Sequence, residues 1–187
     1  MRVTSPRLPL VLLLAASAFA LTGCSPEAAV PSAPPSAEAE PLFASDEEAL
    51  AAAEAAYAEY LSLTNKILQD GGQGGDAIEP LVSEAVLSDE VEGFDYWQSN
   101  GWRSVGGTEL VSAILQQVSQ LQSGAEVVAF MCLSYESVDV IDSAGESQVP
   151  SDRPPLATYE AVLVFEDPDS WTLERNEFWE TPDSCEQ

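Results

Sequence analysis

An apolar run near the N-terminus limits how much of this 187-residue chain is left to form a folded domain. The run covers residues 8–21, follows the basic residues Arg2 and Arg7, and ends in small residues that stand before Cys24. A basic segment, an apolar segment and a small-residue cleavage site are the three parts of an export signal. The run is shorter than the roughly 20 apolar residues that a transmembrane helix needs. We therefore expect residues 1–23 to be a signal peptide that takes no part in the fold.

The four residues Leu21-Thr22-Gly23-Cys24 match the lipobox, the cleavage motif of bacterial lipoproteins. In this motif the cysteine becomes the lipid-carrying N-terminus, so Cys24 is the expected lipidation site. We expect this lipid to include palmitate and to make the membrane a partner of the protein. Two acyl chains attach a protein to a membrane stably, whereas one chain alone attaches it only marginally. The expected location is the extracytoplasmic face of the cell membrane of a Gram-positive type bacterium. The alternatives are an ordinary secretory signal with an accidental cysteine, or a signal anchor.

Between the expected lipid and the fold lies a segment of unusual composition. Residues 24–44 are rich in Pro, Ala, Ser and Glu and hold few side chains that build a core. This composition predicts a disordered, partly polyproline-like tether. Ser45-Asp46-Glu47-Glu48 then has the pattern of a capping box, which marks the start of a helix. We expect the folded domain to span residues 45–187.

The charge of the chain is one-sided, with 32 acidic residues against 6 basic ones and a formal net charge of −26. The basic residues beyond the expected signal are Lys66, Arg103, Arg153 and Arg175. Proteins bind nucleic acids and anionic lipid headgroups through Lys and Arg, so this composition argues against nucleic acid as a partner. We interpret the acidic surface as a source of solubility and mutual repulsion rather than as a binding site.

Two cysteines remain after Cys24, namely Cys132 and Cys185. Export to an oxidising compartment permits a disulfide between them, and the alternative is two free, buried thiols. The bridge would close a loop of about 54 residues, which stabilises by about 4 kcal/mol in the chain-entropy model. The sequence contains no histidine and no paired-cysteine spacing. We therefore expect no metal site and no cofactor.

The first half of the expected domain has helical patterns. From the capping box to about residue 70, small and apolar side chains recur on one stripe that includes Tyr57 and Tyr60, and Gly71-Gly72 ends the helix. The glycine-rich run that follows lacks the ending of a phosphate loop, so we interpret residues 71–75 as a flexible connection. Asp76 is expected to cap a short helical turn before Val82.

A second helix is expected from Ser83 to Gly101, with Leu87, Val91 and Phe94 on its apolar face. This segment also carries five acidic residues, which we interpret as its solvated face, with an acid–base role as the alternative. These residues are Glu84, Asp89, Glu90, Glu92 and Asp95.

From Trp102 onward the sequence shifts to β-branched and aromatic residues, which are typical of strands. Residues 103–105 begin a strand, and residues 109–122 fit both a helix and a strand face, so their own pattern leaves the alternative open. A long strand is expected over residues 125–141. A hairpin is expected over residues 159–179, with a proline-containing type I turn between its strands.

Helices followed by several long antiparallel strands predict an α+β fold in which N-terminal helices pack on one face of a curved antiparallel sheet. This order resembles the cone-shaped nuclear transport factor two-like (cystatin-like, SnoaL-like) superfamily, and more narrowly the small actinobacterial lipoproteins that carry such a domain. The residues behind the resemblance are Ala56-Tyr57-Ala58-Glu59-Tyr60, the stretch Gly101 to Thr108, the strand with Cys132, and Cys185. The resemblance covers about residues 45–185 and implies that residues 109–122 are a strand.

The resemblance also implies a ligand cavity at the open end of the cone. We expect large aromatic side chains to line it, namely Tyr57, Tyr60, Trp97, Trp102 and Phe130. The superfamily includes isomerases and dehydratases that use Asp, His or Tyr inside the cone, and many members of no known activity. Because this chain has no histidine, and no Asp on an apolar strand face, we assign no catalytic residue.

Three functions stay open at this point. The first is a non-catalytic, membrane-anchored domain that binds a small apolar ligand or an envelope protein. The second is an enzyme of the isomerase or dehydratase type that uses cavity carboxylates and tyrosines. The third is an accessory subunit of a cell-envelope assembly. The sequence favours the first, because it lacks histidine and any nucleophile–base pair.

Overall fold

The computed structural model describes residues 40–180. The expected signal peptide, most of the expected tether, Cys24 and Cys185 lie outside these residues, so lipidation and the disulfide stay predictions. Within residues 40–180, no helix combines the length and the apolar character needed to cross a membrane.

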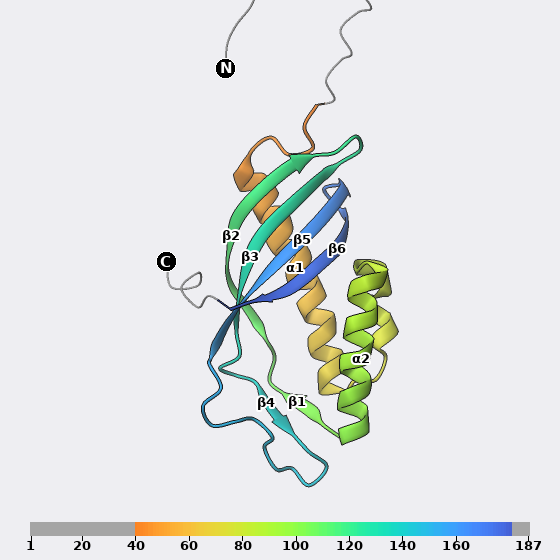
Figure 1. The fold of residues 1–187 in the computed structure, drawn as a ribbon, viewed down its shortest axis with the longest axis vertical. Helices are drawn as coiled ribbons and strands as arrows, with labels where there is room; N and C mark the ends of the chain where they lie inside the picture. The colour runs from red at the N-terminus through yellow and green to blue at the C-terminus, as the bar shows by residue number, and fades with distance from the viewer. Residues whose placement is uncertain (1–39, 181–187) are drawn as a thin grey trace, which may run out of the picture. The chain divides into compact units, whose positions relative to one another are not determined.

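The described residues form an α+β fold, as the sequence predicted (Figure 1). Strands β2, β3, β5 and β6 make an antiparallel sheet in the order β2-β3-β5-β6, and β1 pairs with β4 in a separate two-stranded sheet. Residues 109–122 are therefore mainly strand. In chain order the elements are α1 (Asp46–Gln69), η1 (Gly75–Leu81), α2 (Glu84–Asn100), β1 (Arg103–Val105), β2 (Glu109–Gln120), β3 (Ala125–Ser134), β4 (Asp139–Ile141), β5 (Leu156–Asp167) and β6 (Ser170–Trp179).

Helix α1 begins at the predicted capping box. The Ser45 hydroxyl accepts a hydrogen bond from the backbone N–H of Glu48 at 3.3 Å. The Glu48 carboxylate accepts one from the N–H of Ala44 at 2.8 Å, one residue before the expected donor. Three acidic residues in the first turn also complement the positive end of the helix dipole.

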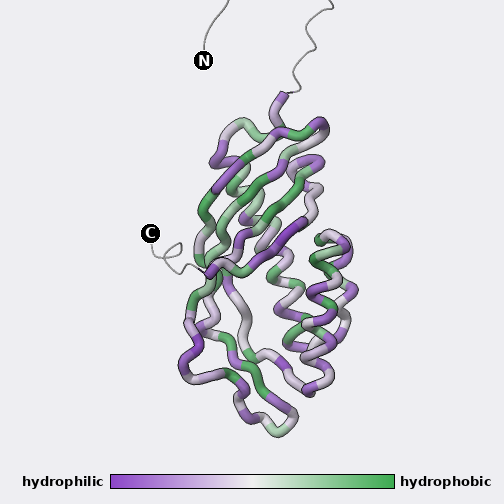
Figure 2. Tube along the Cα trace, in the orientation of Figure 1, coloured by the Kyte–Doolittle hydropathy of each residue, from purple (hydrophilic) through white to green (hydrophobic). Residues whose placement is uncertain are grey.

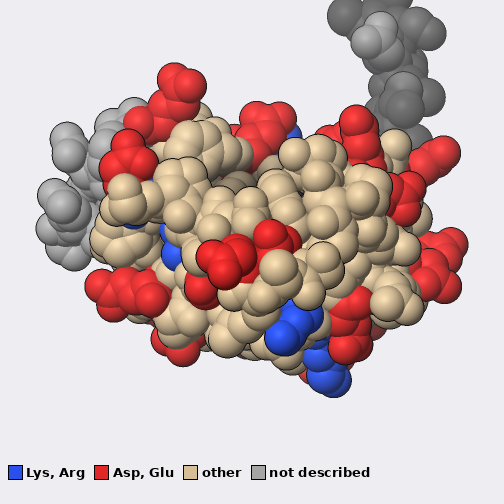
Figure 3. Space-filling model, turned by 90° about the horizontal axis from the view of Figure 1, so that it is seen from below, with Lys and Arg blue, Asp and Glu red and all other residues tan. Residues whose placement is uncertain are grey.

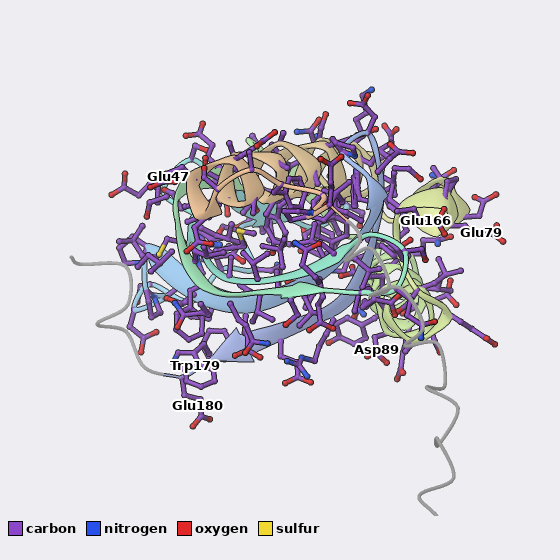
Figure 4. All side chains as sticks on the ribbon, turned by 90° about the horizontal axis from the view of Figure 1, so that it is seen from above. Glu47, Glu79, Asp89, Glu166, Trp179 and Glu180 are labelled. Carbon is purple, nitrogen blue, oxygen red and sulfur yellow. The ribbon has the colours of Figure 1, made fainter. Side chains whose placement is uncertain are left out.

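The hydrophobic core lies between α1 and one face of the four-stranded sheet, which curves beneath the helix (Figure 4). Side chains alternate between the two faces of each strand, so every second residue of β3 and β5 points toward α1. Those of β3, Val127, Ala129 and Met131, are fully buried, as are Leu163 and Phe165 of β5. The central strands are accordingly the most apolar part of the sheet (Figure 2).

The core extends into the segment that was expected to be tether. The ring of Phe43 is buried and meets the ring of Phe165 edge to face, with 5.2 Å between their centroids. The N–H of Leu42 also donates to the side-chain carbonyl of Gln120 at 3.2 Å. The chain therefore packs against the sheet before the capping box at Ser45.

The long strand expected over residues 125–141 is wrong in one respect, because it is broken in two. Strand β3 ends at Ser134, and the N–H of Val138 donates to the carbonyl of Tyr135 at 3.0 Å to close a turn. After this turn the chain leaves the four-stranded sheet, and β4 pairs with β1 instead. An apolar, β-branched pattern does not reveal that the strand changes its partner.

The glycine-rich connection after α1 is closely packed against α2, in contrast to the flexible segment that we expected. A Cβ atom added at Gly72 would lie 2.3 Å from the carbonyl oxygen of Phe94, and one at Gly75 would lie 2.6 Å from the Phe94 ring. The expectation for Asp76 is also wrong. Gly74, in the left-handed conformation, occupies the N-cap position of η1, and no side chain caps this helix.

Candidate functional site

A β-bulge in β6 determines which of its side chains face the helices. Arg175 lies opposite Val162 and Leu173 lies opposite Leu163, so Glu174 is an extra residue in the strand. An extra residue re-aims the side chains that follow it. Asn176 thereby faces α1, while Arg175 forms an ion pair with Glu160 at 2.6 Å.

Two buried tyrosines of α1 meet the side chain of Asn176. Tyr57 and Tyr60 are three residues apart and so lie on one side of the helix, with 5.5 Å between their ring centroids. The Tyr57 hydroxyl donates to Oδ1 of Asn176 at 2.9 Å, and Nδ2 of Asn176 donates to the Tyr60 hydroxyl at 3.4 Å. The amide of Asn176 thus joins both tyrosines through its two ends.

The chain of hydrogen bonds ends on a carboxylate of α2. The Tyr60 hydroxyl donates to Oε1 of Glu90, which corrects the expectation that Glu90 belongs to the solvated face of this helix. Glu90 follows Val86 by four residues and precedes Phe94 by four, so it shares the inward face with these two buried side chains. The other four acidic residues of the expected face are exposed.

Burial determines the protonation of this cluster. Desolvation raises the pKa of Glu90, the hydrogen bond from Tyr60 opposes that shift, and the nearby charge of Asp89 adds to it. Desolvation also raises the pKa of Tyr57 and that of Tyr60 well above the ordinary value, and the Glu90 charge raises that of Tyr60 further. Both tyrosines therefore remain protonated donors, and Glu90 is the member of the cluster that titrates at lower pH.

A second aromatic group continues the cluster along the same face of the sheet. The hydroxyls of Tyr135 and Tyr159 lie 3.4 Å apart, and the Tyr159 ring meets Phe178 at 5.8 Å between centroids. Desolvation raises the pKa of Tyr135. Arg153 fixes this end of the fold, since its guanidinium donates to the carbonyls of Tyr135 and Val138 at 2.8 and 2.7 Å.

A hollow of about 260 Å³ lies between α2 and β6, beside Glu90 and Asn176. The bulge turns Arg175 toward Glu160, so the positive charge at this rim is paired. Asp89, labelled in Figure 4, marks the α2 side of the hollow. The lining residues are Ala85, Val86, Asp89, Glu90, Glu174, Arg175, Asn176 and Glu177.

The five aromatic residues expected to line one cavity lie in three places. Tyr57 and Tyr60 belong to the buried cluster described above. Trp97 and Trp102, 6.2 Å apart between centroids, pack together where α2 ends and β1 begins. Phe130 lies on the opposite face of the sheet, 5.0 Å from Trp179 between ring centroids.

Acidic groups also dominate the surface, and Figure 3 shows Asp and Glu side chains spread over the face it presents, with few basic ones. Despite this abundance, no group of three or more His, Cys, Asp or Glu side chains among residues 40–180 is arranged to hold a metal ion. What the candidate site supplies is a partly desolvated carboxyl, an amide, and tyrosine hydroxyls that stay protonated.

Comparisons with known proteins bear on the fold. No protein-family model and no curated protein matches this chain. The intermembrane space region of the chloroplast protein ARC6 is similar in structure, with a TM-score of 0.51 at 10% sequence identity, over 71% of this chain and 97% of that one. A de novo designed β-sheet protein gives a TM-score of 0.30 at 14% identity, over 75% of this chain and 95% of its own. The first likeness supports the α+β fold alone, and the second is too low to carry an argument.

Proposed function

We propose that this protein is anchored by a lipid on Cys24 to the extracytoplasmic face of a cell membrane. We propose further that its domain binds a small polar ligand in the hollow between α2 and β6. The support for anchoring is the lipobox, residues 21–24, at the end of the apolar run. The support for binding is the hollow itself and the hydrogen-bonded cluster at its side.

The position of Glu90 carries the binding proposal. Partial burial of a carboxylate removes some of its hydration, which costs free energy. Folds keep such a group where its charge has a specific partner or where it takes part in a functional site. Glu90 has Tyr60 as its partner on the core side, and it also lines the hollow on the solvent side. A ligand in the hollow would therefore meet an acceptor whose orientation is already fixed.

The lining favours a ligand that carries hydrogen-bond donors, such as a small amine. Asp89, Glu90, Glu174 and Glu177 contribute carboxylates, and the guanidinium of Arg175 is engaged by Glu160. An ammonium group gains from such carboxylates, whereas a purely apolar ligand would desolvate them without compensation. The proposed ligand is thus more polar than the apolar one expected from the aromatic residues of the sequence.

A second candidate function is acid–base catalysis of the isomerase or dehydratase type. The observation that favours it is the raised pKa of Glu90, which brings a general base closer to neutral pH. Glu90 would remove a proton from a bound substrate and return it at another position. We place this candidate second because the hydroxyl of Tyr60, which would polarise a substrate, is already directed at Glu90.

Native mass spectrometry of the full exported protein, purified without denaturation, tests the binding proposal. The expected result is a co-purified small molecule that the Glu90→Gln variant loses and that Asp95→Asn, an exposed change on the same helix, retains. Equal occupancy in both variants would contradict a site at Glu90. Incubation with the released molecule separates the two functions, since an enzyme converts it to an isomer or a dehydrated product and a binding protein returns it unchanged.

A further inference from the structure

A second hollow, of about 420 Å³, lies where α1 and α2 end and β1 begins. Both helices run toward this end of the domain in Figure 1. A glycine with positive φ turns the chain at each helix end, Gly71 at 73° and Gly101 at 65°. The residues that line the hollow are Gln69, Asp70, Gly71, Gln73, Gln98, Gly101, Trp102 and Arg103.

Hydrogen bonds hold the two helix ends in place around this hollow. The N–H of Gly72 donates to the carbonyl of Ile67 at 2.7 Å, and the N–H of Trp102 donates to the carbonyl of Trp97 at 3.1 Å. Such bonds close the last turn of a helix. Nε2 of Gln98 donates to the Gly72 carbonyl at 2.9 Å, which joins the end of α2 to the chain that follows α1. The fold therefore forms the hollow without the help of a ligand.

Trp102 gives the hollow an apolar wall. Its ring meets the ring of Tyr96 edge to face, with 5.4 Å between centroids, and that of Trp97 in the same way at 6.2 Å. These contacts leave Trp102 only partly buried. An indole is large, apolar and has few rotatable bonds, so a ring that its neighbours already hold offers a ligand a ready surface.

The rest of the lining is polar and its charges are balanced. Asp70 and Arg103 bring one negative and one positive charge, and both side chains are exposed. The ion pairs among residues 40–180 involve Arg175, so the guanidinium of Arg103 keeps its donors for a ligand. Nε2 of Gln69 donates to the carbonyl of Gly106 at 2.8 Å, which fixes an amide whose Oε1 is an acceptor.

This lining favours a neutral ligand that carries hydroxyl groups. An anion would meet Asp70 and the carbonyl ends of two helices, which carry partial negative charge. A cation would meet Arg103, and a purely apolar ligand would desolvate both charges without compensation. A saccharide has none of these costs, because its C–H face packs on an indole and its hydroxyls donate to and accept from amide, carboxylate and guanidinium groups.

We infer that this hollow binds a neutral saccharide, with Trp102 against a sugar ring and with Asp70 and Arg103 bonded to its hydroxyls. The exposed amide of Gln73 supplies a further donor and acceptor at the rim. The inference is independent of the proposed ligand at Glu90, because the two hollows share no lining residue.

An NMR titration of the isotope-labelled full chain with two neutral sugars, triacetylchitotriose and maltotriose, tests the inference. The expected result is saturable shifts of the backbone amides of residues 70–73 and 101–103 with at least one of them. Trigalacturonic acid, an anionic trisaccharide, should bind at least tenfold more weakly than that sugar. The inference is overturned if neither neutral sugar gives saturable shifts at these residues, or if the anionic trisaccharide binds equally well.

Variants locate the sugar within the molecule. Trp102→Ala should lower the affinity at least tenfold, provided that circular dichroism shows the variant to be folded. Gln73→Ala removes an exposed side chain and should lower the affinity at least threefold, so it decides the matter if Trp102→Ala does not fold. Gln116→Ala, a change of an exposed glutamine on β2, and Glu90→Gln should keep the wild-type affinity. Wild-type affinity in Gln73→Ala and in a folded Trp102→Ala, or loss of binding in Glu90→Gln, would overturn the site.

Discussion

The hydroxyl of Tyr60 donates a hydrogen bond to the carboxylate of Glu90, and this contact joins α1 to α2. The same carboxylate lines the hollow between α2 and β6. Because Asn176 donates to the Tyr60 hydroxyl and accepts from Tyr57, the sheet is joined to both helices through one polar cluster. The cluster fixes the position of a carboxyl that would otherwise be free to turn into solvent.

The raised pKa of Glu90 gives stability a defined dependence on pH. A carboxyl whose pKa is higher in the folded state contributes stability fully below its unfolded pKa, and that contribution is lost as pH rises through the folded pKa. We expect Glu90→Gln, which cannot ionise, to lose less stability than the wild type as the pH rises through the range above the ordinary glutamate pKa. Urea denaturation across this range measures it. Asp95→Asn should keep the wild-type dependence, and the same behaviour in Glu90→Gln would contradict the prediction.

Removing the hydroxyl of Tyr57 should destabilise the fold. Tyr57→Phe leaves Oδ1 of Asn176 without its donor in a partly buried setting, at a cost of about 1 kcal/mol. Tyr96→Phe is the matched control, because the Tyr96 side chain is exposed. Removing its hydroxyl should lower the stability by less than about 0.5 kcal/mol. Chemical denaturation of both variants provides the comparison, and equal costs would argue against a structural role for the Tyr57–Asn176 contact.

Gly72 should tolerate a side chain less well than Gly74. Both have positive φ, at 84° and 77°, so an alanine at either position carries similar backbone strain. At Gly72 the new Cβ would also lie 2.3 Å from the carbonyl oxygen of Phe94, whereas nothing lies within 4 Å at Gly74. We expect Gly72→Ala to cost at least about 1 kcal/mol more than Gly74→Ala, as overpacking does. Thermal unfolding of the two variants measures this difference. Equal losses of stability would contradict the close packing of the connection against α2.

Replacing Cys24 by alanine tests the anchor. The lipobox requires a cysteine at the cleavage position, so Cys24→Ala should release the protein from the membrane fraction or leave the signal uncleaved. Fractionation with immunodetection, together with the mass of the exported chain, measures both outcomes. A neighbouring change, Ser25→Ala, should leave the protein attached. If Cys24→Ala fractionates and migrates like the wild type, Cys24 is not the anchor.

Much of the fold followed from local signals in the sequence. Ser45 and Ser83 cap the two helices as predicted, and Gly101 ends the second one. Periodicity left residues 109–122 open between helix and strand, and the resemblance only favoured the strand that the structure shows at Glu109–Gln120. The break of the expected long strand after Ser134 was missed, because Val138 and Val140 have the same strand-forming character as β3 while β4 pairs elsewhere.

The candidate site was harder to predict, for two physical reasons. Glu90 stands four residues from both Val86 and Phe94, a spacing that places it on the inward face, but an acidic side chain is ordinarily assigned to solvent. Asn176 faces α1 because the extra residue Glu174 shifts the alternation of β6, and no local pattern marks that bulge. If the side chains of β6 alternated between the two faces without a bulge, Arg175 would lie beside the tyrosines in place of Asn176.

The most direct test of the central claim is an NMR titration of the isotope-labelled full chain with a panel of small amines, carboxylates and sugars. We predict saturable shifts of the backbone amides around Glu90 and Asn176 with at least one amine. We also predict at least a tenfold loss of affinity in Glu90→Gln and wild-type affinity in Asp95→Asn. Shifts confined to other surfaces, or equal affinity in the two variants, would contradict a ligand site between α2 and β6.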